Sequence, residues 1–145
     1  PTEQEREKAA RGPNGSLFPW GNTPDPKKAN TGADVGYGPS DPNFGKIDGY
    51  GAWAPVGAMR GDKSFYGVMD MAGNVSEWTD TWDAHRDFQT EQIPVVRGGS
   101  FGSSEVGLLQ RNLTNSPRQN KTRQIGFRCV ASQPPPPKAS PPAKK

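Results

Sequence analysis

Glycine and proline recur so often along this chain that they exclude long helices and a large regular sheet. The 145 residues include 18 glycines and 16 prolines, and the stretch from Phe18 to Gly61 is punctuated throughout by Gly, Pro, Asn and Asp. Proline cannot continue a helix, and glycine favours turns. A loop region this long needs something to order it, and metal ligation suits such oxygen-rich residues. We therefore expect an irregular fold, partly ordered by metal, rather than a helical bundle or a doubly wound sheet.

Apolar content and charge narrow the class of protein further. Hydrophobic residues make up only 30% of the chain, although four tryptophans can each bury roughly 150–250 Å². The net charge of +3 equals the charge of Lys138, Lys144 and Lys145 near the end of the sequence, so residues 1–132 are neutral overall. Lys and Arg form no cluster there of the kind that nucleic acid requires. No apolar run approaches the ~20 residues of a membrane-spanning helix.

Cysteine and histidine each occur once, as Cys129 and His85. A single cysteine excludes an internal disulfide. Cys129 and His85 together cannot supply the three or four N/S ligands of a usual zinc site. Cys129 lies in an apolar segment, so we expect it to be a small buried residue rather than a reactive thiol.

The first residues predict a short helix. Thr2 and Glu5 have capping-box spacing, and acidic residues favour the positive end of the helix dipole. Helix-forming residues continue to Arg11, and the sequence Gly-Pro-Asn-Gly at 12–15 ends the helix. An isolated helix of about ten residues is marginal in water, so it must dock on something.

Three short segments predict strands. The turn pair Gly73-Asn74 precedes a segment that carries Trp78 and Trp82 with interleaved threonines. Residues 94–97 form the second candidate, which Gly98-Gly99 closes. Residues 125–130 alternate in character and form the third. The tryptophans are expected to belong to the core.

Residues 133–145 differ from the rest of the chain. They read Gln-Pro-Pro-Pro-Pro-Lys-Ala-Ser-Pro-Pro-Ala-Lys-Lys, a composition that cannot bury a core and prefers extended polyproline II. We therefore divide the chain into a domain at 1–132 and a tail at 133–145, and we expect a partner surface to hold the tail.

Several strings of residues, in order, resemble the formylglycine-generating (sulfatase-modifying factor) family. The resemblance covers residues 1–131. It implies an elaborated C-type-lectin-like α+β domain, of which this chain is a C-terminal portion, either cut from a longer chain or completed by another. The strings are Pro1-Thr2-Glu3 with residues 8–12, Phe18-Pro19-Trp20-Gly21-Asn22, residues 67–78, Arg97-Gly98-Gly99-Ser100-Phe101 and Gly126-Phe127-Arg128-Cys129.

The resemblance also implies two structural calcium ions. Calcium takes six to eight oxygens and accepts backbone carbonyls from tight turns, although Asp48 and Asp70 could instead merely cap turns. The first implied set has the side chains of Asn30 and Asp48 with the carbonyls of Thr31 and Tyr50. The second has Asp70 with the carbonyls of Met71, Gly73 and Val75.

Catalysis is where the chain departs from the family. The resembled enzyme has two cysteines shortly after its Gly-Gly-Ser segment that bind copper, whereas residues 101–109 here are Phe-Gly-Ser-Ser-Glu-Val-Gly-Leu-Leu. Serine and leucine cannot form the soft thiolate site that copper(I) prefers. The lone His85 cannot provide the histidine cluster of iron-dependent relatives.

Two functional hypotheses follow. The first is a non-catalytic binding or accessory module of a larger assembly, which presents residues 103–120 to a ligand or partner. The second is an oxidoreductase of the formylglycine-generating type, whose reactive groups lie on an upstream portion. Calcium sites fill where the ion is abundant, so we expect a periplasmic, cell-envelope or extracellular location.

Overall fold

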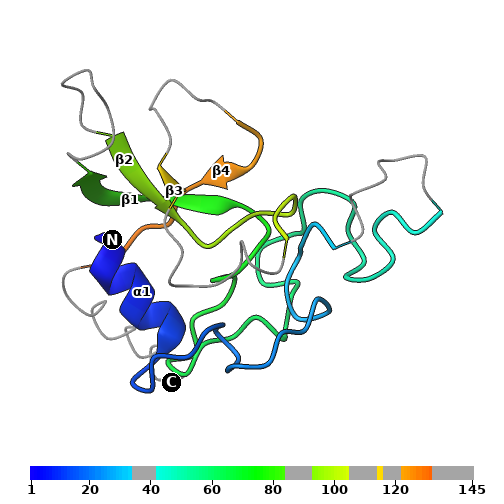
Figure 1. Ribbon diagram of the computed structural model, residues 1–145, viewed down its shortest axis with the longest axis horizontal. Helices are drawn as coiled ribbons and strands as arrows, with labels where there is room; N and C mark the ends of the chain where they lie inside the picture. Colours follow the sequence, from blue (N-terminus) through cyan, green and yellow to red (C-terminus); the bar gives the residue numbers. More distant parts are fainter. Residues whose placement is uncertain (34–41, 84–92, 105–113, 116–121, 132–145) are drawn as a thin grey trace, which may run out of the picture.

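The computed structural model describes residues 1–33, 42–83, 93–104, 114–115 and 122–131. Within these residues the regular elements are one helix and four short strands, joined by long loops (Figure 1). The elements are α1 (Glu3–Arg11), β1 (Ser76–Asp83), β2 (Ile93–Arg97), β3 (Thr114–Asn115) and β4 (Ile125–Gly126).

Helix α1 begins and ends where the sequence predicts. Thr2 adopts an extended conformation as N-cap, its hydroxyl accepts from the Glu5 N–H, and the Glu5 carboxylate accepts from the Thr2 N–H. This reciprocal capping box satisfies two amide groups that the first helical turn leaves free. Gly12 takes a positive φ of 65° and donates its N–H to the Lys8 carbonyl, which ends the helix.

The four strands form one sheet in the order β3-β2-β1-β4. Strand β1 pairs antiparallel with β2, and the register shifts between Trp78 and Trp82, which marks a bulge. Strand β4 pairs parallel with the start of β1, and β3 pairs antiparallel with β2. The predictions of β1 and β2 are confirmed, whereas β3 was not predicted.

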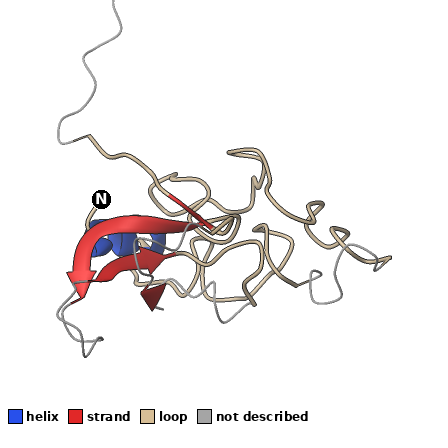
Figure 2. Ribbon diagram, turned by 90° about the horizontal axis from the view of Figure 1, so that it is seen from above, coloured by secondary structure: helices blue, strands red, loops and turns tan. Residues whose placement is uncertain are grey.

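Helix α1 packs against one face of β1 (Figures 1 and 2). The buried Arg6 on the helix donates to Glu77 on the strand, and the Glu3 N–H donates to the Thr81 hydroxyl at 2.9 Å. The apolar core beside this contact is built of small and medium residues. Its buried members are Ala10, Phe18, Ala29, Ala54, Met59, Met71, Ala72, Val95 and Val96. Among the described residues, buried polar side chains such as Arg6, Asn30 and Glu77 accompany this apolar core.

The turn at Gly73-Asn74 joins the loop region to the sheet. Gly73 has a φ of 69°, and a Cβ there would lie 2.1 Å from the Asn30 carbonyl oxygen, so only glycine fits. The Asn74 N–H donates to that carbonyl, and the Asn74 side chain exchanges hydrogen bonds with the backbone of Ala54. Three loop segments that are far apart in sequence therefore meet at this turn.

The third predicted strand is much shorter than expected, and the expectation for Cys129 was wrong. Strand β4 ends at Gly126, and within the described part of the chain the residues after it pair with no strand. Phe127 is 77% exposed, Val130 is 59% exposed, and Cys129 is an exposed free thiol. An alternating pattern cannot by itself show where strand pairing stops, because pairing depends on the neighbouring strand.

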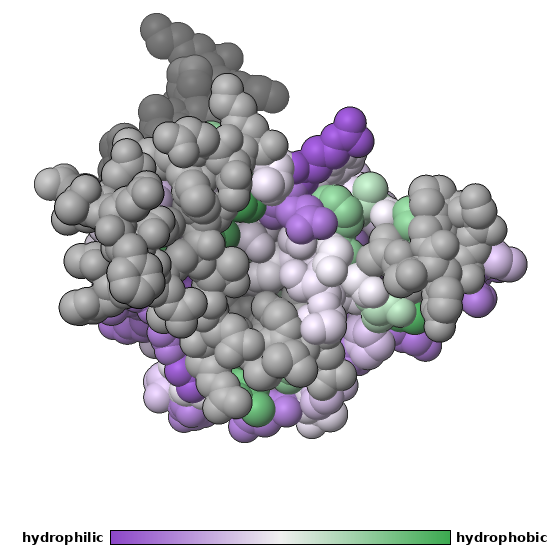
Figure 3. All heavy atoms as spheres, turned by 45° about the horizontal axis from the view of Figure 1, so that its top comes forward, coloured by the Kyte–Doolittle hydropathy of each residue, from purple (hydrophilic) through white to green (hydrophobic). Residues whose placement is uncertain are grey.

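The surface is mixed in character. On the face drawn in Figure 3, hydrophobic residues lie in separate spots among hydrophilic ones. Among the residues that the structure describes, no helix has the length and apolar character needed to cross a membrane.

Candidate metal sites and the buried charge network

The first predicted calcium set is assembled by two loops. Both oxygens of the Asp48 carboxylate accept backbone N–H groups, from Thr31 at 2.7 Å and from Tyr50 at 2.9 Å. The Asn30 side chain is fully buried, and its amide nitrogen donates to Ala52 and Asn74. Its Oδ1 atom is buried and has no hydrogen-bond partner within the described residues.

An orphaned buried oxygen of this kind ordinarily costs about 1–3 kcal/mol. A divalent cation would satisfy it, and the Asp48 carboxylate is held next to Asn30 by the N–H of the following residue, Thr31. The first set therefore fits calcium chemically, with a single carboxylate and otherwise neutral oxygens.

The second predicted set is brought together only in part. Asp70, Gly73 and Val75 line one hollow of about 270 Å³, together with Glu77 and Arg128. The Asp70 carboxylate accepts from the Gly57 N–H at 2.7 Å. A cation there would have two carboxylates nearby, but the Arg128 guanidinium already contributes a positive charge.

Met71, the remaining member of the second set, contacts a different group. Its carbonyl accepts from the buried Arg6 guanidinium at 2.9 Å, and its side chain is almost fully buried. The Arg128 guanidinium also donates to the carbonyl of Asp70 at 2.6 Å. The second set is therefore less well suited to calcium than the first, because arginine already neutralises part of it.

No cluster of three or more His, Cys, Asp or Glu side chains suited to a metal occurs in the part of the chain that the structure describes. The predicted calcium sets have one carboxylate each, so such a cluster is not required of them. His85 lies outside the described residues.

Glu77 is the centre of a buried charge network. Its carboxylate accepts from Arg6 Nε at 2.7 Å and from Arg128 Nε at 2.8 Å, and the Glu77 side chain is 7% exposed. Burial lowers the pKa of Arg6, and the charge of Glu77 opposes that shift. Arg128 thus ties the segment after β4 to β1 through Glu77. Arg111 and Arg118 lie outside the described residues.

Asp62 is a buried carboxyl group that the sequence did not reveal. It is fully buried, its Oδ2 atom accepts from the Ala72 N–H at 2.7 Å, and its Oδ1 atom has no partner within the described residues. Burial raises the pKa of Asp62 to about 7; the hydrogen bond from Ala72 opposes this rise, and the charge of Asp70 adds to it. A single aspartate in a polar turn gives no sequence signal for such burial.

The Gly98-Gly99-Ser100 turn is fixed by serine hydrogen bonds. The Ser103 hydroxyl accepts from the Ser100 N–H at 2.8 Å, and the Ser103 N–H donates to the Ser100 carbonyl at 2.9 Å. The Ser103 carbonyl accepts from Gly32, which joins this turn to the loop that holds Asn30. Ser103 therefore serves as a structural link in this turn.

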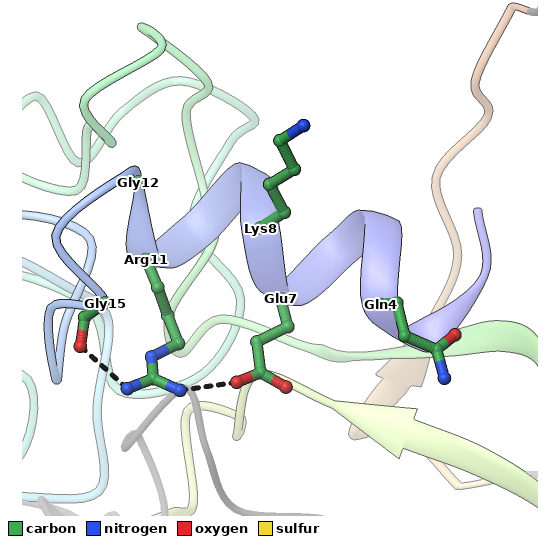
Figure 4. Close-up of a pocket in the computed structure, with 6 residues that line it drawn as sticks. All are labelled: Gln4, Glu7, Lys8, Arg11, Gly12 and Gly15. Atoms are coloured by element: carbon green, nitrogen blue, oxygen red, sulfur yellow. Dashed lines mark hydrogen bonds and ion pairs between the residues drawn. The ribbon is translucent and has the colours of Figure 1, made fainter.

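The outer side of α1 has a polar hollow of about 300 Å³ (Figure 4). Arg11 donates to the Glu7 carboxylate and to the Gly15 carbonyl, and Lys8 points away from both. Glu7 also accepts from Arg97 on β2. These groups attach the end of the helix to the following loop and to the sheet, and they form no catalytic arrangement.

Comparison with known families gives a match along nearly the whole chain. The model of the sulfatase-modifying factor enzyme 1-like domain matches residues 1–133. The chain belongs to this family. The resemblance predicted from the sequence is thereby confirmed.

Among the relatives in this family, some have names that describe them as inactive and others have names that describe them as enzymes. The inactive C-alpha-formylglycine-generating enzyme 2 of Bos taurus is 32% identical over 143 residues, which cover 94% of this chain and 45% of the relative. The formylglycine-generating enzyme of Mus musculus is also 32% identical, over 146 residues that cover 90% of this chain and 38% of the relative. The chain spans less than half the length of these relatives.

Solved structures agree with the fold. PvdO from Pseudomonas aeruginosa aligns with a TM-score of 0.63 at 29% identity, covering 87% of this chain and 49% of PvdO. Treponema denticola variable protein 1 aligns with a TM-score of 0.66 at 24% identity, covering 88% of this chain and 45% of that protein, and it supports the fold alone. The predicted loop-rich α+β fold of the sulfatase-modifying factor family is confirmed.

Proposed function

We propose that this chain is part of a non-catalytic domain of the sulfatase-modifying factor family, which acts as a binding or accessory module of a larger assembly. Calcium stabilises its loops, and it works in the periplasm, the cell envelope or outside the cell. The observation that supports this proposal is the chemistry of the segment after Gly98-Gly99-Ser100. Residues 101–109 contain no cysteine, and Ser103 is engaged in the hydrogen bonds of its own turn.

Sequence identity to relatives does not by itself decide whether this chain is catalytic. The chain is equally similar to a protein named as inactive and to one named as an enzyme, at 32% identity in both cases. The choice between a binding module and an enzyme therefore depends on the residues of this chain. Its one cysteine, Cys129, is exposed and lies in the segment after β4, where a single thiol cannot form the paired thiolate site that the resemblance implies for catalysis.

The partner that best fits the structure is the upstream portion of the same kind of domain. The chain spans less than half the length of the two relatives named above, and Val56, Phe65 and Phe127 are largely exposed. Val56 and Phe127 line the same hollow, and an exposed apolar patch favours burial against another polypeptide. Residues 103–104 and 114–115 are the described parts of the proposed binding segment 103–120, and the first pair lies beside the Gly-Gly-Ser turn.

The calcium part of the proposal is supported by Asn30 and Asp48. One carboxylate with neutral oxygens predicts weak binding, with a dissociation constant of about 10⁻⁴–10⁻³ M, the range of extracellular calcium modules. Ten millimolar calcium should then raise the free energy of unfolding by about 1.4–2.7 kcal/mol per filled site. For a chain of this size, that corresponds to a rise in Tm of roughly 3–10 °C.

Differential scanning calorimetry with calcium, with magnesium and with chelator tests this expectation. Asp48→Asn should abolish most of the calcium-dependent rise, whatever its effect on stability without calcium. Asp70→Asn is the matched variant at the second set and should abolish less of it, because Arg128 already neutralises that hollow. Equal Tm values in calcium and in chelator would show that calcium does not order the loops.

The alternative function is an oxidoreductase whose reactive groups lie on an upstream portion. Elemental analysis of the purified protein separates the two functions. Calcium without stoichiometric copper or iron favours the binding module. One copper or iron per protein, retained through gel filtration, favours catalysis and would contradict the proposal.

A further inference from the structure

Asp70 lines the hollow of about 270 Å³ beside the Gly73-Asn74 turn, here called the Asp70 hollow, and its carboxylate has capacity left for a ligand. The Oδ2 atom accepts from the Gly57 N–H at 2.7 Å, whereas no described residue donates to Oδ1. The ion pairs in the described part of the chain end on other carboxylates, those of Glu3, Glu7 and Glu77. A cation that enters the hollow would therefore meet a carboxylate with which no described basic side chain forms an ion pair.

Arg128 also lines the Asp70 hollow, but its nitrogens donate elsewhere. Nε donates to Glu77 at 2.8 Å, Nη1 to the Met69 carbonyl at 3.2 Å and Nη2 to the Asp70 carbonyl at 2.6 Å. The nearby guanidinium repels a divalent ion more than a monovalent one, because the repulsion grows with the charge of the ion. Calcium also needs six to eight oxygens, and the Met71 carbonyl of the predicted set already accepts from an arginine. The hollow therefore suits a cation with a single charge.

The rim of the Asp70 hollow is apolar. Val56 is 92% exposed and Phe127 is 77% exposed, and both line the hollow together with Met69. Val56 directly precedes Gly57, whose N–H holds the Asp70 carboxylate, so part of the apolar rim is fixed next to the charge. An aromatic ring near a carboxylate suits an organic cation, because the face of the ring attracts positive charge.

We propose that the Asp70 hollow binds the side chain of a lysine that a partner polypeptide presents. The inference rests on the proposed binding function and names the chemistry of its ligand. The ammonium group donates to Asp70 Oδ1, and the methylene stem lies against Val56 and Phe127. Pockets for drug-sized ligands have volumes of ~300–1,000 Å³, so a hollow of about 270 Å³ suits one side chain.

Lysine fits this hollow better than arginine does. A guanidinium binds a carboxylate best through two parallel hydrogen bonds, which need both carboxylate oxygens. Oδ2 of Asp70 is already used by Gly57, which leaves Oδ1. An ammonium group is a compact charge that can bind through this one oxygen.

Nuclear magnetic resonance of the full chain tests the proposal with an isolated lysine side chain. The probe is Nα-acetyl-lysine methylamide, added at constant ionic strength with a chelator present. The backbone amide signals of Gly57 and Phe127 should shift with probe concentration and saturate. The matched probe, Nα-acetyl-norleucine methylamide, keeps the stem without the ammonium group and should bind about fivefold more weakly, as expected for the loss of one exposed ion pair.

Three variants locate the binding. Asp70→Asn should remove most of the preference for lysine over norleucine, and asparagine tolerates the positive φ of 57° at this position. Phe127→Leu should weaken lysine binding without loss of folding, because the ring is largely exposed. Phe65→Leu is the matched control, since Phe65 is also largely exposed but packs near Gly12, outside the lining of the hollow. It should leave the affinity unchanged.

Equal affinity for the lysine and norleucine probes, or the absence of saturable shifts at Gly57 and Phe127, would overturn the proposal. So would signals that move with added calcium and not with the lysine probe, because they would show that the hollow is a metal site. The copper and iron content of the purified protein tests the non-catalytic module separately, so either proposal can fail while the other stands.

Discussion

Replacing Glu77 by glutamine is expected to lower the free energy of unfolding by roughly 3–5 kcal/mol, because it removes the carboxylate that balances buried arginine charge. Arg6 is 1% exposed at its side chain and donates to Glu77 at 2.7 Å. Arg128 donates to the same carboxylate from the segment after β4. Glutamine keeps the size of the side chain. The loss of stability is therefore due to the missing charge and not to a cavity.

Urea denaturation of both proteins measures this difference. Glu5→Gln is the matched control, because glutamine also completes a capping box and the exposed Glu5 has no buried partner. The control should unfold at nearly the same urea concentration as the parent protein. A change of less than about 1 kcal/mol for Glu77→Gln would mean that the network is much more solvated than its burial indicates.

The second large effect concerns Asp62, whose replacement by asparagine is expected to stabilise the protein in a pH-dependent way. Burial raises the pKa of Asp62 to about 7 in the folded protein, whereas an unfolded chain has an aspartate pKa of ~3.9. The folded state therefore binds more protons than the unfolded state between about pH 4 and pH 7. Stability contributed by this group falls as the pH rises through that range and levels off above it.

Asp62→Asn removes this penalty. At pH 8 the variant should be more stable by an amount on the order of 2–4 kcal/mol, and near pH 4 the difference should largely vanish. Thermal or urea unfolding across this pH range, without added divalent cations, measures both values. A gain of the same size at pH 4 and pH 8 would contradict the expected titration, as would a loss of stability at pH 8.

Local signals in the sequence predicted the local structure well. The capping box of Thr2 and Glu5, the Gly12 stop and the Gly73-Asn74 turn depend on a few neighbouring residues. Each of them forms as expected, because the backbone conformations are set by the residue types themselves. Strands β1 and β2 are likewise found where the sequence predicts them.

Features that depend on distant residues could not be predicted in the same way. The burial of Asp62 and the exposure of Cys129 are set by segments that are remote in sequence, and neither residue type reveals them. Strand β3 has two described residues and no sequence signature. The contact between the Met71 carbonyl and Arg6 also requires knowledge of how α1 docks on the sheet.

The measurement that tests the central claim most directly is oxidation of a cysteine-containing peptide by the purified protein. It is made with copper(I) or iron(II) and oxygen, and mass spectrometry of the peptide follows the reaction. A non-catalytic module should give no aldehyde product above the rate seen with free metal alone. Repeated turnover of the peptide, dependent on protein and abolished by removal of copper or iron, would contradict the account.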